Sequence, residues 1–358
     1  MPSLKEIKGR INSISSTLAI TSAMKMVAAA KLQKAQMAIQ NMLPYERRLH
    51  SMLIDLMGAM NISAAASEDG SVRGSGSAER GFDQSGDRLS LSNRHDLAGM
   101  DGAYSLMAQR EVRKVAIVAF ASNSSLCGAF NSNAIREATA VINEYRASGL
   151  GDADITVYSV GRKMAEAMRK LGFPSPADFT KMSDSPSYEA ASALAQELLD
   201  GFVSGRFDKV ELVYNHYKST SSQPTTRQTY LPLSLADATA DLQAGKIADS
   251  ASESDTNRGA EPVGAPVVRQ GSPTTEDLIV EPSKEELIVT LLPKVVRLRV
   301  FTTLLDSTAA EQAARTVAMQ LATDNGNDLL QELTLEYNKG RQQKITSEIL
   351  DLVGGSLQ

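Results

Sequence analysis

Apolar residues at the start of the chain recur with the spacing of a long amphipathic helix. Five of them are separated alternately by three and four residues, which is the seam of a coiled coil: Leu4, Ile7, Ile11, Ile14 and Leu18. The seam then shifts and continues, which predicts a helix over residues 3–60, roughly 87 Å long at the rise of an α-helix. Pro44 interrupts the pattern, so we expect a bend there, after which the helix resumes.

A second helical pattern covers residues 283–352. Its seam begins at Leu298, Phe301 and Leu305, and polar residues continue the same phase until Met319 restores it. Neither helix can bury its seam alone, so the economical arrangement is an antiparallel coiled coil of the two. The polar interruptions leave a second possibility open, in which the helices pack in a bundle with another subunit.

Between the helices, residues 111–232 alternate between strand-like and helical patterns. Strands are predicted at 112–119, 155–160 and 210–217, and helices at 129–147, 162–171 and 187–204. This alternation is typical of an open, mainly parallel sheet that is covered by helices. The predicted fold class is therefore α/β, with the coiled coil as a rod and the sheet domain as an appendage near one end.

Two stretches, residues 63–105 and 245–280, are rich in Ser and Gly and have little apolar periodicity. Such a composition favours flexible insertions, although a small hairpin around residues 89–91 is an alternative for the first stretch. The predicted organisation is an N-terminal coiled-coil helix at 1–62, an insertion at 63–110, an α/β domain at 111–235, an insertion at 236–280 and a C-terminal coiled-coil helix at 281–358.

The composition excludes several classes of protein. Aromatic residues make up only 5% of the chain and Trp is absent, which argues against one dense globular core. The net charge of −5 argues against a nucleic-acid-binding protein. No apolar run reaches the length of a membrane span, and the first residues lack the apolar segment of a signal peptide. We therefore expect the chain to fold in a reducing cytosol.

The sequence contains no recognisable catalytic, phosphate-binding or metal-binding motif. Cys127 is the only cysteine, and the three histidines are far apart, so neither a disulfide framework nor a metal site is expected. The turn after the first strand, residues 122–131, has one Gly, too few for a phosphate-binding loop. Cys127 lies at the start of a helix, but no His is near it in sequence, which favours a small buried side chain over a nucleophile. His216 lies among strand residues and is expected to be structural. We predict no catalytic, cofactor-binding or metal-binding residues.

One segment, residues 20–36, combines many alanines with Lys25, Lys31 and Lys34. A basic helix face on an acidic protein suggests contact with an acidic partner, although a solvated face is the ordinary interpretation. Residues 20–31 read Ile-Thr-Ser-Ala-Met-Lys-Met-Val-Ala-Ala-Ala-Lys, which closely resembles the N-terminal helix of the gamma subunits of F-type ATP synthases.

Further segments resemble the same family in the same order along the chain: Leu126–Asn131, Arg315–Asn325, Leu333–Asn338 and Arg341–Gly355. The resemblance covers about residues 1–62, 111–235 and 278–355. The chain departs from the family pattern in its longer insertions, in Ser122-Asn-Ser-Ser where Ser-Asp-Arg-Gly is common, and in Gly354-Gly355 where Gly-Ala is common. The second departure puts in doubt any ion pair that the family makes at that turn.

The resemblance implies a rotor shaft without chemistry of its own. The terminal helices would form an axle inside a ring of three alpha and three beta subunits. The Rossmann-like middle domain, together with the epsilon subunit, would dock on the membrane ring of c subunits. One copy per complex is implied, at the cytoplasmic face of the bacterial inner membrane, with membrane association only through the c-ring. A passive coiled-coil scaffold, or a nucleotide-binding α/β domain with helical arms, is the alternative.

The resemblance also marks positions for partner contact. Met24 and Lys25 match the positions that meet an acidic loop of the beta subunit. Four further positions match the C-terminal sites at which shaft and ring exchange polar contacts: Arg315, Gln342, Thr346 and Glu348. An ordinary solvated or intra-coil role is the alternative for each of the six residues.

Overall fold

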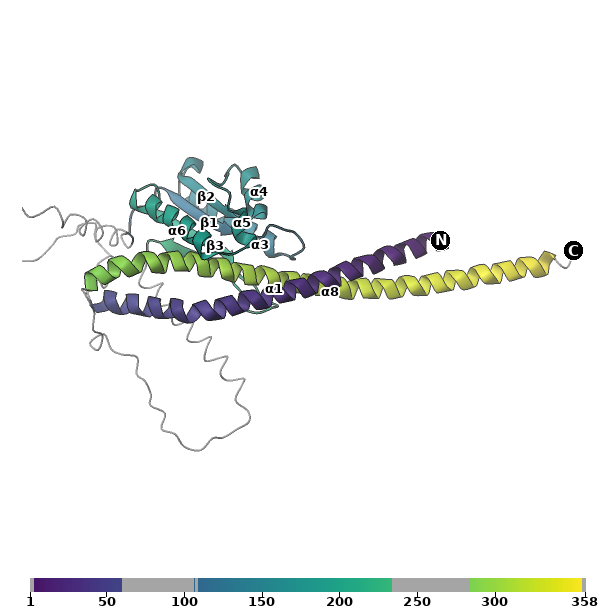
Figure 1. The fold of residues 1–358 in the computed structure, drawn as a ribbon. Coiled ribbons are helices and arrows are strands. Elements are labelled where there is room, and N and C mark those ends of the chain that lie inside the picture. The colour runs from purple at the N-terminus through teal and green to yellow at the C-terminus, as the bar shows by residue number, and fades with distance from the viewer. Residues whose placement is uncertain (1–2, 60–105, 107–108, 234–283, 356–358) are drawn as a thin grey trace, which may run out of the picture.

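The computed structural model describes residues 3–59, 106, 109–233 and 284–355. Two helices are much longer than the other described elements: α1, Leu4–Ala59, and α8, Lys284–Gly355. They lie side by side and run in opposite directions, and the C-terminal end of α8 extends beyond the start of α1 (Figure 1). This confirms the predicted antiparallel pair. The flexible segments expected at 63–105 and 245–280, and the alternative hairpin at 89–91, lie outside the described residues.

The register of the helix pair is fixed by leucines that pack over glycines. A Cβ atom at Gly326 would lie 2.6 Å from Leu18 Cδ2, and one at Gly340 would lie 3.1 Å from Leu4 Cδ2. Glycine inside a helix costs about 1 kcal/mol relative to alanine, so close approach of the partner explains both positions. Because Leu4 is opposite Gly340, the residues of α8 after about 340 extend past the described start of α1.

Both long helices contain a proline and continue through it. Pro44 lies inside α1 and Pro293 lies inside α8. Beyond Pro44, Leu49 and Leu53 are buried in the same apolar cluster as residues of the sheet domain. This tertiary packing offsets the backbone hydrogen bond that a proline removes, so the helix resumes as predicted.

The middle of the chain forms a four-stranded sheet with the order β2-β1-β3-β4. The strands are β1, Val115–Phe120; β2, Ile155–Val160; β3, Lys209–Asn215; and β4, Thr225–Leu231. Strand β1 pairs in parallel with β2 and β3, whereas β4 pairs antiparallel with β3. The helices are α3, Phe130–Ala147; α4, Arg162–Lys170; α5, Thr180–Asp184; and α6, Tyr188–Val203. A single 3-10 turn, Asp152–Asp154, precedes β2.

Strand β4 was not predicted, because five of its seven residues are only partly buried and its first half is polar. A buried carboxylate on β3 explains its pairing. The guanidinium of Arg227 on β4 donates two hydrogen bonds to Glu211, at 2.6 and 3.1 Å. Although burial opposes it, hydrogen bonds from Arg227, Lys209 and Tyr145 hold the pKa of Glu211 below its ordinary value.

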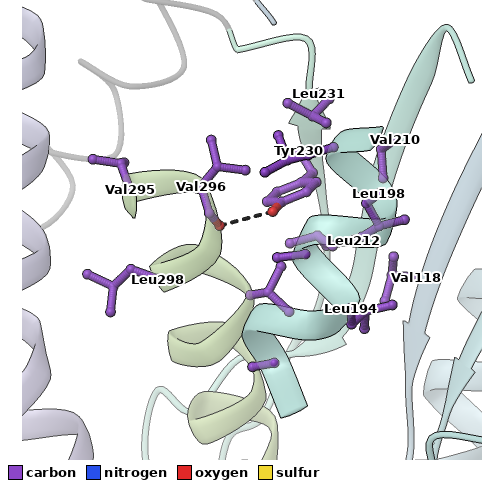
Figure 2. Close-up of a cluster of buried hydrophobic side chains, with 14 of the residues drawn as sticks. Val118, Leu194, Leu198, Val210, Leu212, Tyr230, Leu231, Val295, Val296 and Leu298 are labelled. Carbon is purple, nitrogen blue, oxygen red and sulfur yellow. Dashed lines mark hydrogen bonds between the residues drawn. The ribbon is translucent and has the colours of Figure 1, made fainter. Parts of the chain in front are cut away.

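The sheet has helices on both faces, and one of them belongs to the helix pair. Val115, Ile117 and Ala119 of β1 share one core with α3 and α4. The residues that alternate with these three along β1 face the other side of the sheet. There they form a second core with α6 and the first part of α8. In that core the Tyr230 hydroxyl donates a hydrogen bond of 3.0 Å to the Val296 carbonyl (Figure 2). The domain lies near one end of the rod, as predicted, and it shares its core with α8 (Figure 1).

Gly161 makes the tight turn from β2 into α4. Its φ is +98°, and a Cβ atom there would lie 2.0 Å from the Ala121 carbonyl oxygen. Gly172 has a similar φ of +92°, but a Cβ atom there would meet nothing within 4 Å. Gly161 therefore combines a positive φ with a close approach that Gly172 lacks.

We predict that Gly161→Ala lowers the free energy of unfolding by roughly 3 kcal/mol or more, because strain and overlap add. Gly172→Ala, the matched control, should cost only about 1 kcal/mol for the positive φ. Urea unfolding of the full chain, followed by circular dichroism, measures both. Equal losses in the two variants would contradict the close approach at Gly161.

Candidate functional site

The carboxyl ends of the strands form the edge at which open α/β sheets bind ligands. Strand β1 has neighbours on both sides, and the chain turns to opposite sides of it, so the switch point lies at the end of β1. Here that place is filled by α8, because Ala310 is fully buried in one apolar cluster with Cys127 and Phe130. The edge that would bind a nucleotide is occupied by the protein's own helix, which disfavours the nucleotide-binding alternative.

The loop after β1, residues 121–129, is held by its own polar groups. Asn131 accepts a hydrogen bond of 3.0 Å from the Ser122 N–H and donates one of 3.2 Å to the Ser124 carbonyl. Cys127 is 1% exposed, and the Asn131 amide lies 3.2 Å from its sulfur. The thiol is thus a small buried side chain, as the sequence predicted. Within the described ranges, no cluster of His, Cys, Asp and Glu could hold a metal ion.

Arg315, one of the predicted contact residues, lies at the junction of α8 and this loop. It is 9% exposed, and its guanidinium pairs with Glu311 at 2.8 Å and donates to the Ser124 hydroxyl at 2.7 Å. Burial raises the pKa of Glu311 above its ordinary value, against the opposing effect of Arg315. The structure therefore gives Arg315 one partner on its own helix and one on the loop after β1.

Met24 and Lys25 lie partly exposed on α1. Met24 shares a helix face with Ile20 and Val27, which are spaced four and three residues from it and are 60% and 58% exposed. Lys25 is about 100° away around the helix axis from Met24. This part of α1 therefore presents exposed apolar side chains beside one lysine.

Gln342, Thr346 and Glu348 lie on the part of α8 that extends past the start of α1, which we call the overhang, residues 341–355. Gln342 and Thr346 lie one turn apart on one face of the helix, and the Thr346 hydroxyl donates to the Gln342 carbonyl at 2.9 Å. Glu348 points to another side of the helix and lies 3.8 Å from Lys344. Exposed apolar side chains also gather here: Ile345, Ile349, Leu350 and Leu352 are 47–75% exposed.

The six predicted residues thus occupy two levels of the rod. Met24 and Lys25 lie near the level of Arg315, because Thr21 of α1 is hydrogen-bonded to Thr323 of α8, and the other three are on the overhang. From Arg315 to Thr346 the helix rises by roughly 46 Å. A single partner that contacts all of them must extend at least this far along the rod.

A contact that sequence reasoning missed joins the sheet domain to both long helices. Asp306 on α8 binds the His216 ring nitrogen Nδ1 at 2.6 Å and accepts a hydrogen bond of 2.8 Å from the Tyr217 N–H. The Gln36 amide of α1 donates to the Tyr217 hydroxyl at 2.7 Å. The sequence indicated a structural His216, but its partner is 90 residues away along the chain, so no local pattern could reveal it.

The chain is similar to known proteins over nearly its whole length. A family model described as ATP synthase matches residues 3–357. A chain from Phocaeicola vulgatus, named ATP synthase gamma chain, is 46% identical over 357 residues and covers all of both chains. The chain of that name from Bacteroides thetaiotaomicron is 44% identical over the same full coverage.

Among solved structures, a chain of the Euglena gracilis mitochondrial ATP synthase, in its OSCP/F1/c-ring part, is similar in fold. The TM-score is 0.51 at 19% identity, and the match covers 99% of this chain and 93% of that one. None of the described helices is long and apolar enough to cross a membrane.

The contact between His216 and Asp306 predicts a raised pKa for the His216 ring. The hydrogen bond and charge of Asp306 raise the pKa of His216 above its ordinary value of 6.5, whereas burial and Lys218 oppose the shift. The pair therefore stabilises the fold fully below pH 6.5 and loses this contribution as the pH rises through the raised pKa. NMR titration of the His216 ring should show a lower pKa in Asp306→Asn than in the unmodified chain. Asp324→Asn, on an exposed part of α8, is the control; equal pKa values in all three proteins would contradict the pairing.

Proposed function

The chain belongs to the gamma-chain family of ATP synthases, and from this premise we propose how its long helix pair works as a rotor shaft. As a central-stalk subunit it couples ion-driven rotation of the membrane c-ring to conformational change in the catalytic beta subunits. In this role the chain transmits torque and carries no bond chemistry of its own.

The observation that best supports this proposal is the overhang of α8. Ile345, Ile349 and Leu352 share one helix face and are 47%, 55% and 75% exposed. Contiguous exposed apolar side chains indicate a surface that is covered in the working protein. We propose that the ring of three alpha and three beta subunits encloses this end, with one copy of the chain at its centre.

The mechanism follows from symmetry. One shaft inside a ring of threefold pseudosymmetry cannot make the same contacts with all three beta subunits. Each beta subunit therefore meets a different face, such as the one that carries Met24 or the one that carries Lys25. A partner that binds one state of a subunit better shifts it to that state, so turning the shaft changes the nucleotide affinity of each beta subunit in turn.

The contact residues follow the same proposal. Met24 and Lys25 meet an acidic loop of the beta subunit, and Gln342, Thr346 and Glu348 make polar contacts near the far end of the ring. Polar contacts of this kind can be exchanged as the shaft turns, whereas a fully apolar interface would hold one position. Arg315 acts through the loop after β1, since Glu311 and Ser124 already occupy its guanidinium.

The remaining partners lie at the other end of the rod. We propose that the sheet domain, with the epsilon subunit, docks on the c-ring. The complex is then at the cytoplasmic face of the bacterial inner membrane, and this chain reaches the membrane only through the c-ring. A passive scaffold, the remaining alternative, would assemble with the same partners without changing their activity.

Reconstitution separates these functions. Mixing the chain with its partner alpha and beta subunits should yield complexes with one copy per ring and with ATPase activity above that of alpha and beta alone. A ring without the chain, or a complex whose ATPase activity does not rise, would contradict the shaft.

Met24→Lys tests the contact on α1. A new cation facing an acidic loop should hold the shaft at one position within the ring. The number of ions pumped per ATP should therefore fall severalfold, with assembly intact. Met26→Lys is the matched control, because Met26 is 66% exposed on another side of the same helix. Ion pumping and ATP hydrolysis are measured together in vesicles; equal ratios in the two variants would contradict the assigned contact.

A further inference from the structure

The connection between β3 and β4, residues 216–224, crosses the carboxyl edge of the sheet and reaches both long helices. Its first two residues hold α8, because the His216 ring and the Tyr217 N–H both bind Asp306. The same Tyr217 holds α1, because its hydroxyl accepts a hydrogen bond of 2.7 Å from Gln36. We call these four residues, Gln36, His216, Tyr217 and Asp306, the clasp.

The base of this connection is fastened to the sheet domain. The His216 N–H donates to the Pro224 carbonyl at 2.8 Å, which closes the connection on itself. The buried Asn215 side chain donates to the Phe130 carbonyl at 3.1 Å and accepts from the Thr225 hydroxyl at 2.7 Å. A force on Tyr217 is therefore passed to α3 and to both strands.

The seam of the helix pair is shallow at this level. Leu32 and Ala35 of α1 pack against Ala309 and Ala313 of α8, and all four are less than 9% exposed. Alanine side chains interlock far less than the larger side chains of a regular coiled-coil seam. Tyr217 packs against this cluster and also against the one formed by Cys127, Phe130 and Ala310. It supplies bulk and hydrogen bonds where the seam is made mainly of alanines.

We propose that the clasp is the positioning element that makes the sheet domain and both long helices turn as one unit. The proposal rests on the proposed shaft function, in which torque enters at the domain and leaves along the helices. Arg315 ties the loop after β1 to α8 alone. The clasp adds a bond to α1, so it resists sliding of α1 along α8 under load.

The test uses complexes reconstituted in vesicles, with ions pumped per ATP as the measure. Asp306→Ala and Tyr217→Phe should each lower this ratio severalfold while ATP hydrolysis continues, and the double variant should lower it most. His216→Lys provides a permanent cation for Asp306 and should pump like the unmodified chain. The controls are Asp324→Ala on α8 and Tyr188→Phe, whose hydroxyl lies outside the clasp.

The outcomes separate the clasp from the shaft function. If the unmodified chain gives no coupled pumping, the shaft function fails. If the unmodified chain pumps and both clasp variants pump equally well, the shaft function stands and the clasp is overturned.

Hydrogen exchange of the isolated full chain decides the case in which a variant does not assemble. The Tyr217 amide should be protected in the unmodified chain and lose its protection in Asp306→Ala, while the Ile117 amide in the centre of β1 keeps it. A Tyr217 amide that exchanges freely in the unmodified chain would overturn the clasp.

Discussion

The structure depends on one constraint: two helices of 56 and 72 residues cannot bury their apolar seams alone and must pack against each other and against the sheet domain. Their close approach requires small residues, and the seam accordingly contains Gly326 and Gly340 under leucines and alanines nearer the domain. A rod of this kind is stiff along its axis and has no thick core. This explains why a chain of 358 residues has no Trp and few aromatic residues.

The sheet domain is built onto the rod, because α8 supplies part of its core. Ile288, Leu292 and Val296 of α8 are buried with residues of β1, β3 and α6. Further along, α8 covers the carboxyl edge of the sheet, where many related folds bind a nucleotide. The same helix thus closes the ligand site of an α/β fold and connects the domain to the distant overhang. Fold and function agree here, since a domain that transmits torque needs firm attachment and no substrate.

The sequence predicted elements best where burial is uniform. Strand β2 was predicted at residues 155–160 and lies there, since four of its six residues are apolar and nearly all of it is buried. Strand β4 was missed because its pairing with β3 depends on the contact between Arg227 and the buried Glu211. Apolar periodicity does not reveal such a contact. For the same reason the periodicity placed Arg315 in the seam but could not reveal Ser124, 191 residues away. The exposed positions Gln342, Thr346 and Glu348 came from resemblance alone, because nothing in a polar helix surface marks a partner.

Rotation of the sheet domain is the most direct test of the shaft. A complex fixed to a surface through its ring, with a bead attached to the sheet domain, should rotate in one direction during ATP hydrolysis. It should pause at three positions per turn, because the ring has three catalytic subunits. A bead that only fluctuates while the ring hydrolyses ATP would contradict the conclusion that this chain is a shaft driven as one unit.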